Sequence, residues 1–294
     1  MYSAIAKCRN HNLSIDCKLD IFDKAIKPIL LYACEVWGFC DNKLLERLHL
    51  KFCKHILKLK TSTPNFMVFG EVGRFPLSIN IKVRMIGFWT KMIESSHNKL
   101  SCKLFQICNN YNTQWSNCIK NIFEECNLVH IFENQEFINV KWLKSCIFYT
   151  LKNKFISDWK NEVFNSPKGT NYRIYKHDLI LEQYLFNLPP RLAKIYCKFR
   201  TCNIKLPVEC SRWNNIPREN RICNLCNLNE IGDEFHYLFN CSDQEILINR
   251  KKFLSRYYFE SPSTFKFNTL FNYVVNDELI SLVKFINIIN CRLN

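Results

Sequence analysis

Four residues between positions 223 and 241 form the clearest chemical pattern in the chain. Cys223 and Cys226 are separated by two residues, so one tight turn can direct both sulfurs at the same ion. His236 and Cys241 follow five residues apart and can close the far side of a tetrahedron. Three thiolates and one imidazole form a closed structural zinc set, with no open position for a catalytic water. Thiolate ligands also disfavour magnesium and calcium.

The same four residues allow two interpretations that involve no metal. A single CxxC pair is unremarkable in a chain with 17 cysteines, so Cys223 and Cys226 are alternatively ordinary buried thiols and His236 a surface residue. A redox pair is a further alternative, but no strand–helix–strand pattern surrounds the CxxC. The matching His and third Cys favour a metal site. Gly232, between the ligand pairs, predicts a turn with a positive φ angle where the loop reverses.

Net charge indicates the class of partner. The chain has 41 Lys and Arg against 26 Asp and Glu, a net charge of +15, which suits a polyanion such as RNA or DNA. The alternative is a basic protein without such a partner. Residues 191–221 hold eight Lys and Arg against two Glu and lead directly into the Cys/His pattern. We predict that these eight residues contact phosphates: Arg191, Lys194, Lys198, Arg200, Lys205, Arg212, Arg218 and Arg221.

Trp213 lies within this basic stretch. An aromatic side chain beside cations can stack on a nucleobase. The alternative is a Trp buried in the core, where its large apolar surface is removed from water.

Composition favours a helical fold. Hydrophobic residues make up 48% of the chain, enough for a substantial core, whereas only 6 Gly and 9 Pro are present. Sandwiches of short strands need many tight turns, so we predict a mainly α protein, a multi-helix bundle with a small CCHC zinc knuckle near the C-terminus. Apolar periodicity predicts the following helices: 15–38 with an interruption at Pro28, 42–60, about 78–95, several within 100–165, 178–187, one beginning near 190, 244–259 and 277–291.

Loops and compartment follow from the same sequence. Residues 61–76 are expected to form a loop or broken segment, and 166–170 a linker between helical regions 1–165 and 170–294. The 17 irregularly spaced cysteines do not form a secreted disulfide framework, and the N-terminus lacks the apolar core of a signal peptide. No apolar run is long enough to span a membrane. We therefore expect an intracellular protein, nuclear or cytoplasmic, without a membrane partner.

Several motifs resemble one known family. The chain reads Leu-Leu-Tyr-Ala-Cys-Glu-Val-Trp-Gly, then a Leu-rich basic helix, Ser-Thr-Pro-Asn and Gly-Glu-Val-Gly-Arg-Phe-Pro-Leu. This order resembles the segment that follows the polymerase palm in LINE-type (non-LTR) retrotransposon reverse transcriptases. A CCHC zinc knuckle often lies further on in that family, in the order found at residues 223–241. The gap of nine residues between Cys226 and His236 is slightly longer than the usual seven or eight.

The resemblance, over roughly residues 15–245, implies a function. Residues 1–165 would be a thumb-like post-palm and linker region, and 170–294 a C-terminal region containing the knuckle. Together they would bind template RNA or target DNA during target-primed reverse transcription. RNA-directed DNA polymerases hold two cations with paired carboxylates, yet no two Asp residues are adjacent here. We therefore assign no catalytic residue and expect no polymerisation by this chain alone.

Two alternatives to this function remain open. One is that polymerase activity is carried by an N-terminal part beyond this chain. The other is a zinc-stapled helical relic or interaction domain without a nucleic-acid role.

Overall fold

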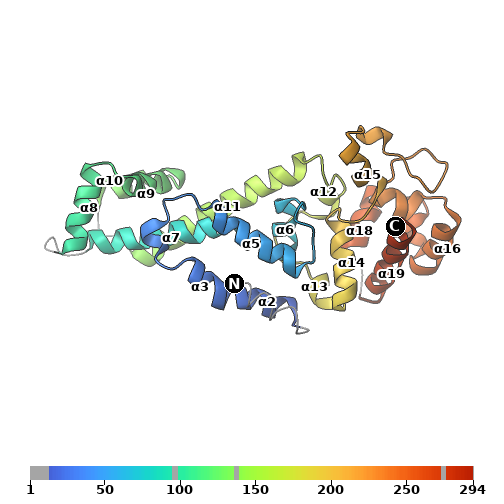
Figure 1. The fold of residues 1–294 in the computed structure, drawn as a ribbon, viewed down its shortest axis with the longest axis horizontal. Coiled ribbons are helices and arrows are strands. Elements are labelled where there is room, and N and C mark those ends of the chain that lie inside the picture. The colour runs from blue at the N-terminus through green and yellow to red at the C-terminus, as the bar shows by residue number, and fades with distance from the viewer. Residues whose placement is uncertain (1–12, 95–98, 136–138, 273–275, 294) are drawn as a thin grey trace. The chain divides into compact units, whose positions relative to one another are not determined.

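The computed structural model describes residues 13–94, 99–135, 139–272 and 276–293. The chain divides into two compact units (Figure 1). Unit 1 comprises Met1–Phe52 and Phe75–Trp159, and unit 2 comprises Cys53–Arg74 and Lys160–Asn294. Residues 53–74 thus belong with the C-terminal part of the chain. The division into regions 1–165 and 170–294, as regions that fold separately, stays a prediction.

The described residues are mainly helical, as composition predicted. No strand is found in the described ranges, where extended pairing is limited to two isolated antiparallel bridges, Val72–Leu181 and Ile222–Ile231. Unit 1 holds the following helices: α2 (Ile15–Ile21), α3 (Lys27–Leu30), α4 (Cys34–Trp37), α7 (Leu77–Ile93), α8 (Leu100–Asn110), α9 (Gln114–Glu125) and α10 (Val129–Asn134). The units meet within α5 (Lys43–Ile56), between Arg74 and Phe75, and within α11 (Val140–Asn165).

Helix α7 is the centre of unit 1. It packs against α4, α8 and α9, and it is apolar on several sides, as its sequence predicted. Trp89 on α7 is fully buried, with its ring centroid 4.9 Å from that of Phe123 on α9. Aromatic residues of the 100–165 region therefore serve mainly as core, although Trp142 is exposed.

The first predicted helix is interrupted twice. A π-turn, η1 (Phe22–Ile26), precedes α3, which carries Pro28 in its first turn. Proline has no N–H to donate to the carbonyls of the preceding turn. The predicted interruption is therefore present. A second break, which the sequence did not indicate, occurs at Ala33, whose φ of 54° is left-handed.

Unit 2 combines α6, from segment 53–74, with the helices of residues 160–294 (Figure 1). Helix α19 packs on α14 and α16, and α12 packs on α18. The helical elements of this unit are: α6 (Asn65–Val72), α12 (Tyr172–Tyr175), α13 (Tyr184–Asn187), α14 (Pro190–Arg200), α15 (Pro207–Cys210), η2 (Ser211–Asn214), η3 (Arg218–Asn220), η4 (His236–Asn240), α16 (Gln244–Phe253), α17 (Arg256–Phe259), α18 (Thr264–Asn272) and α19 (Asn276–Arg292).

Two sequence predictions in unit 2 were wrong. Residues 61–76 are not simply a loop, because α6 lies within them with every residue from Phe66 to Val72 buried. Burial on all sides removes the apolar periodicity by which a helix is recognised. The helix expected at 178–187 is reduced to α13, because Leu181 instead forms a bridge with Val72.

Gly73 explains how α6 ends against this bridge. Its φ of 59° is left-handed, and a Cβ there would lie 2.3 Å from the backbone nitrogen of Leu181. Only glycine combines this conformation with so close an approach of two backbones.

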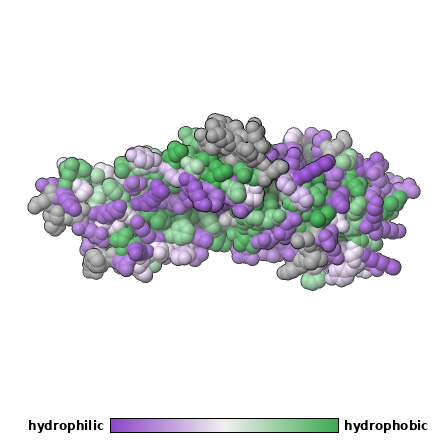
Figure 2. Space-filling view, turned by 90° about the horizontal axis from the view of Figure 1, so that it is seen from below, coloured by the Kyte–Doolittle hydropathy of each residue, from purple (hydrophilic) through white to green (hydrophobic). Residues whose placement is uncertain are grey.

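The surface and the cysteines are as expected of a globular chain. Hydrophilic and hydrophobic residues are interspersed over the face shown in Figure 2.

The cysteines of the described residues are all free thiols in the structure. No helix in the described ranges combines the length and apolar character that crossing a membrane requires.

Candidate metal centre

A short hairpin positions the first two cysteines. The bridge between Ile222 and Ile231 brings its two ends together, and the amide of Cys223 donates to the carbonyl of Glu230 at 2.9 Å. Cys223 follows the bridge directly, and Cys226 lies in the bend beyond it. The amide of Leu225 points at the sulfur of Cys223 from 3.4 Å. Backbone donors of this kind stabilise a thiolate.

A π-turn positions the other two ligand groups. His236 begins η4, and the amide of Cys241 donates to the carbonyl of His236 at 2.8 Å. In an α-helix, side chains five residues apart point about 140° away from each other. The wider π-turn changes this geometry, and π-turns are frequent at functional sites.

The four ligand atoms lie together, as the spacing predicted. All are within 4.8 Å of one another, and no other such group of His, Cys or acidic residues is found in the described part of the chain. The sulfurs of Cys223 and Cys241 are 3.9 Å apart, and Nε2 of His236 is 3.3 Å from the sulfur of Cys226. Tetrahedral zinc requires about 3.8 Å between sulfurs and about 3.5 Å between sulfur and nitrogen. The group could therefore hold a metal ion.

A second layer of residues orients His236. Its Nδ1 is 2.8 Å from a carboxylate oxygen of Glu230, which leaves Nε2 facing the cysteines. The backbone amide of His236 donates to Asp233 at 3.0 Å, so Asp233 fixes the start of this helical turn. Carboxylate partners of this kind set the tautomer and ring orientation of metal-binding histidines. The sequence prediction named neither acid in this role.

The protonation of the group reflects its close packing. A hydrogen bond with Cys241 lowers the pKa of the Cys223 thiol to about 3, against the effect of burial, while the pKa of Cys241 is raised by the same bond. Burial lowers the pKa of His236, but its bonds to Cys223 and Glu230 outweigh burial and raise it to about 9. Metal binding requires thiolates and a neutral imidazole, so loading would release protons.

Arg250 on α16 supports the π-turn from behind. Its buried guanidinium donates to the carbonyls of Leu238 at 2.8 Å and Cys241 at 2.9 Å. These carbonyls lie at the end of the turn, where the helix leaves them without partners. No sequence pattern indicated this role, because the arginine lies nine residues beyond the last ligand.

Gly232 is required for a different reason from the one predicted. The glycines with positive φ in the described residues are Gly73 and Gly169, so the positive-φ prediction for Gly232 was wrong. A Cβ on Gly232 would instead lie 2.8 Å from Cγ of Pro207 and 3.1 Å from Cα of Cys223. The glycine allows the hairpin to pack closely against α15.

Replacing Glu230 with Gln tests the orienting role. The substitution keeps the size of the side chain but removes its charge, so metal affinity should fall about 10- to 100-fold. Competition with a chelator measures the affinity. Glu245→Gln is the control, because Glu245 contacts Arg292 and none of the ligands. Equal affinities of Glu230→Gln and the unmodified chain would contradict the role.

The eight predicted phosphate contacts comprise three exposed residues, one half-buried lysine and four arginines that bond to other groups of the protein. Arg191, Lys194 and Lys205 are exposed, and Lys198 is half-buried. No described carboxylate lies within ion-pair distance of these four. The remaining four are Arg200, Arg212, Arg218 and Arg221.

The side chains of these four arginines bond to carboxylates or backbone carbonyls of the protein itself. Arg218 pairs with Asp233 at 2.9 Å, and Arg212 donates to the carbonyl of Pro167 at 2.9 Å. Arg221 donates to two backbone carbonyls. Arg200 is 1% exposed, so its prediction as a phosphate contact is corrected: it is a core residue.

Segment 53–74 adds cations from outside residues 191–221. The amide of Lys60 donates to the side-chain oxygen of Asn203 at 3.4 Å, and the amide of Asn203 donates to the carbonyl of Lys198 at 2.7 Å, so Lys60 and Lys198 lie near each other. Burial lowers the pKa of Lys198, and the charges of Lys194 and Lys60 lower it further. Burial lowers the pKa of Lys54, and the positive charge of Lys168 lowers it further. We call the following residues of unit 2 the basic cluster: Lys54, Lys60, Lys168, Lys194, Lys198 and Lys205.

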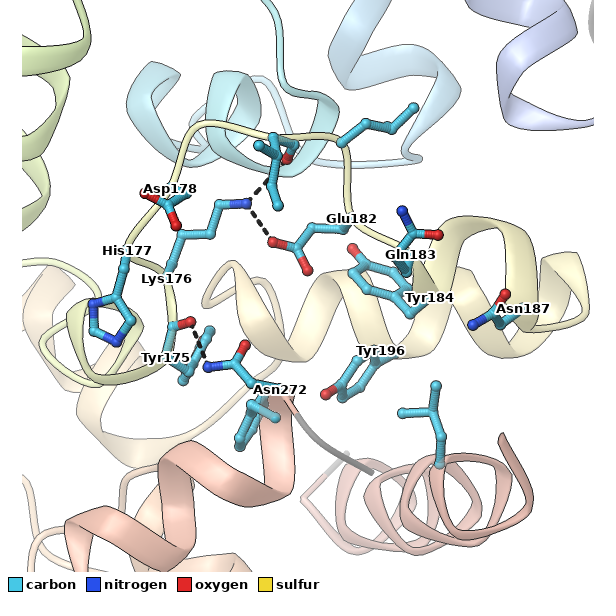
Figure 3. Close-up of a pocket in the computed structure, with 14 residues that line it drawn as sticks. Tyr175, Lys176, His177, Asp178, Glu182, Gln183, Tyr184, Asn187, Tyr196 and Asn272 are labelled. Atoms are coloured by element: carbon cyan, nitrogen blue, oxygen red, sulfur yellow. Dashed lines mark hydrogen bonds and ion pairs between the residues drawn. The ribbon is translucent and has the colours of Figure 1, made fainter. Parts of the chain in front are cut away.

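A cavity of about 300 Å³ lies between residues 175–184 and helices α14, α18 and α19 (Figure 3). Lys176 points inward and contacts Glu182 and the carbonyl of Ile180, the latter at 3.1 Å. Asn272 donates to the carbonyl of Tyr175 at 3.0 Å. Several of its polar groups thus bind one another, and we assign no ligand to this cavity.

Comparison with known proteins adds no identification. No protein-family model matches the chain, and no match is found among the curated proteins or the solved structures compared with it.

Proposed function

We propose that this protein binds a structural zinc ion through Cys223, Cys226, His236 and Cys241, and uses a basic surface of the same unit to bind RNA or DNA. The single observation that carries the proposal is the close cluster of three sulfurs and one imidazole in unit 2, which also contains the basic cluster. In the fuller form of the proposal, the chain is the nucleic-acid-binding C-terminal part of a LINE-type reverse transcriptase.

Zinc is the metal that best fits the donor set. Sulfur and imidazole donors favour zinc over calcium and magnesium, and a complete set of four protein ligands indicates a structural site. The hairpin and η4 pack on α15, α16 and α17 around this cluster. The ion would therefore fix the part of unit 2 in which the ligands lie.

Charge supports the nucleic-acid part of the proposal. Arg191, Lys194 and Lys198 recur at three- and four-residue steps and lie on one side of α14. Lys198 lies near Lys60, and both carry positive charge that no described carboxylate neutralises by an ion pair. Repulsion between such cations is relieved when phosphates lie between them.

The internal bonds of the arginines favour a second candidate function. Arg212, Arg218 and Arg221 are held by carbonyls and by acids near the metal group. If the other cations only solvate the surface, the protein is a zinc-stapled interaction domain without a nucleic-acid role. The two candidates differ in what happens when surface charge is removed.

Removing charge from α14 separates these candidates. Replacing Lys194 and Lys198 with Gln should weaken binding of all sequences alike. The dependence of log K on log salt should flatten by about 0.7 per lost contact on single strands and about 0.9 on duplexes. Fluorescence anisotropy over a salt series measures both quantities.

The matched control removes two lysines from α16. Lys251→Gln with Lys252→Gln lowers net charge equally but outside the basic cluster, so the slope should change less. Replacing Arg212, Arg218 and Arg221 with Gln should chiefly lower thermal stability. A salt slope insensitive to the α14 substitutions, or negligible binding by the unmodified chain, would favour the interaction domain.

A further inference from the structure

A second cavity in unit 2 combines lysines with an exposed tryptophan. Its volume is about 430 Å³, within the range of about 300–1,000 Å³ that is usual for ligand sites. The lining residues are Lys60, Ser62, Lys168, Cys202, Asn203, Ile204, Lys205, Glu209, Cys210 and Trp213. We call it the lysine–tryptophan cavity.

Trp213 is unusual for its exposure. Its side chain lies on η2 and is 78% exposed, so the default expectation of a buried tryptophan was wrong. Burying an aromatic ring is strongly favourable, so one left in water beside a cavity indicates a binding surface. Arg212, its neighbour, donates to the carbonyl of Pro167 at 2.9 Å and thereby holds η2 in place.

Asn203, another lining residue, is held by hydrogen bonds. Asn203 is buried, and its side-chain oxygen accepts a hydrogen bond from the Thr63 hydroxyl at 2.9 Å. Its amide nitrogen donates to the carbonyl of Thr201 at 2.8 Å. These bonds join the turn that carries Lys60 to the turn that precedes Lys205. A preformed wall lowers the entropic cost of binding a ligand.

The charge of the cavity selects an anion. Lys60 and Lys205 are exposed and Lys168 is half-buried, so three ammonium groups border the space. The acid among the lining residues, Glu209, is largely buried and lies 3.6 Å from Arg212. Burial raises the pKa of Glu209, against the lowering effect of Arg212.

We propose that the lysine–tryptophan cavity holds one unpaired nucleotide of a single-stranded nucleic acid, with its base stacked on Trp213 and its phosphates between Lys60, Lys168 and Lys205. This inference rests on the proposed function, whose binding surface it locates. Every base has a π-face, so such a site tolerates many sequences. In a duplex the bases stack on one another and their faces are covered, so the cavity discriminates in favour of single strands.

The test uses the full-length, zinc-loaded chain with a labelled oligo-uridylate and a duplex of equal length. Trp213→Ala should weaken oligo-uridylate binding about 5- to 100-fold, and Trp213→Phe should weaken it less. Lys60→Gln with Lys205→Gln should reduce the salt slope by about 0.7 per contact. Trp142→Ala is the control, because Trp142 is an exposed tryptophan of unit 1, 51% exposed.

Each outcome decides between defined alternatives. If Trp213→Ala binds oligo-uridylate as tightly as the unmodified chain, the cavity is not the site, while the proposed function stands. If the unmodified chain binds neither probe, the proposed function fails. An equal loss of duplex and single-strand binding would overturn the stacking. If inorganic tripolyphosphate displaces oligo-uridylate equally well from Trp213→Ala and from the unmodified chain, the lysines alone bind the anion. Unchanged metal content and thermal unfolding show that each variant is folded.

Discussion

Replacing Cys226 with Ser is expected to abolish metal binding and to unfold the region around the hairpin and η4. The purified chain should carry about one zinc, because the described residues contain one complete ligand set. Apparent binding free energies of structural zinc are about 10–16 kcal/mol in zinc-finger peptides. Whole domains are stable by only about 5–15 kcal/mol, so loss of the ion should remove most local stability.

Elemental analysis and amide hydrogen exchange measure the two consequences. Exchange should increase in residues 222–241 and much less in unit 1. Cys291→Ser is the matched control, since Cys291 is an exposed thiol of unit 2 outside the ligand set. Stoichiometric zinc retained by Cys226→Ser would contradict the assignment of the ligands.

The ligand set could be predicted from sequence because its geometry is local. Cys226 lies in the bend that begins directly after Cys223, and His236 and Cys241 lie at the two ends of one turn. The residues that orient the ligands could not be predicted in the same way. Glu230 reaches His236 only because the hairpin closes, and Arg250 acts from the next helix.

Exposure of the cations could not be read from their sequence positions. Arg200 belongs to the same apparent basic stretch as Lys198, yet one is buried and the other lies near two further lysines. Helical periodicity alone does not show which charged residue meets a buried carboxylate. Lys60 is distant in sequence from residues 191–221, so its nearness to Lys198 could not be predicted from that stretch alone.

Long amphipathic helices were predictable, whereas short buried ones were not. The pattern of residues 42–60 indicated α5, and Asp41 accepts a hydrogen bond from the amide of Lys43, as expected of a cap. Helix α6 lacks a polar face, so no periodicity marked it. Its place in unit 2 depends on contacts with residues more than a hundred positions away.

Those long-range contacts converge on a buried network of charges. Glu71 of α6 accepts from Arg200 at 3.1 Å and from the hydroxyl of Tyr172 at 3.1 Å. Arg200 also pairs with Glu182 at 3.2 Å, and Glu182 pairs with Lys176. Two carboxylates and two cations therefore balance, with Glu71 and Arg200 fully buried and Glu182 partly exposed at the cavity. Four aromatic rings surround the guanidinium of Arg200: Tyr175, Tyr184, Tyr196 and Phe271.

Replacing Arg200 with Met should destabilise the protein by about 3–5 kcal/mol. The apolar side chain fits among the aromatic rings, but Glu71 and Glu182 are left with only Lys176 to balance them. A buried charge without a partner is far more unfavourable than a lost ion pair, because it has no water to solvate it. Urea unfolding monitored by circular dichroism measures the change in free energy.

A second substitution identifies charge imbalance as the cause. Glu71→Gln added to Arg200→Met restores neutrality and keeps a side chain that can bond to Tyr172, so part of the lost stability should return. Arg256→Met is the matched control: Arg256 also pairs with a glutamate, but its side chain is 82% exposed, and its loss should leave unfolding nearly unchanged. If the double variant is less stable than Arg200→Met alone, charge imbalance is not the cause. Packing of Arg200 among the aromatic rings would then be the main source of its stabilising effect.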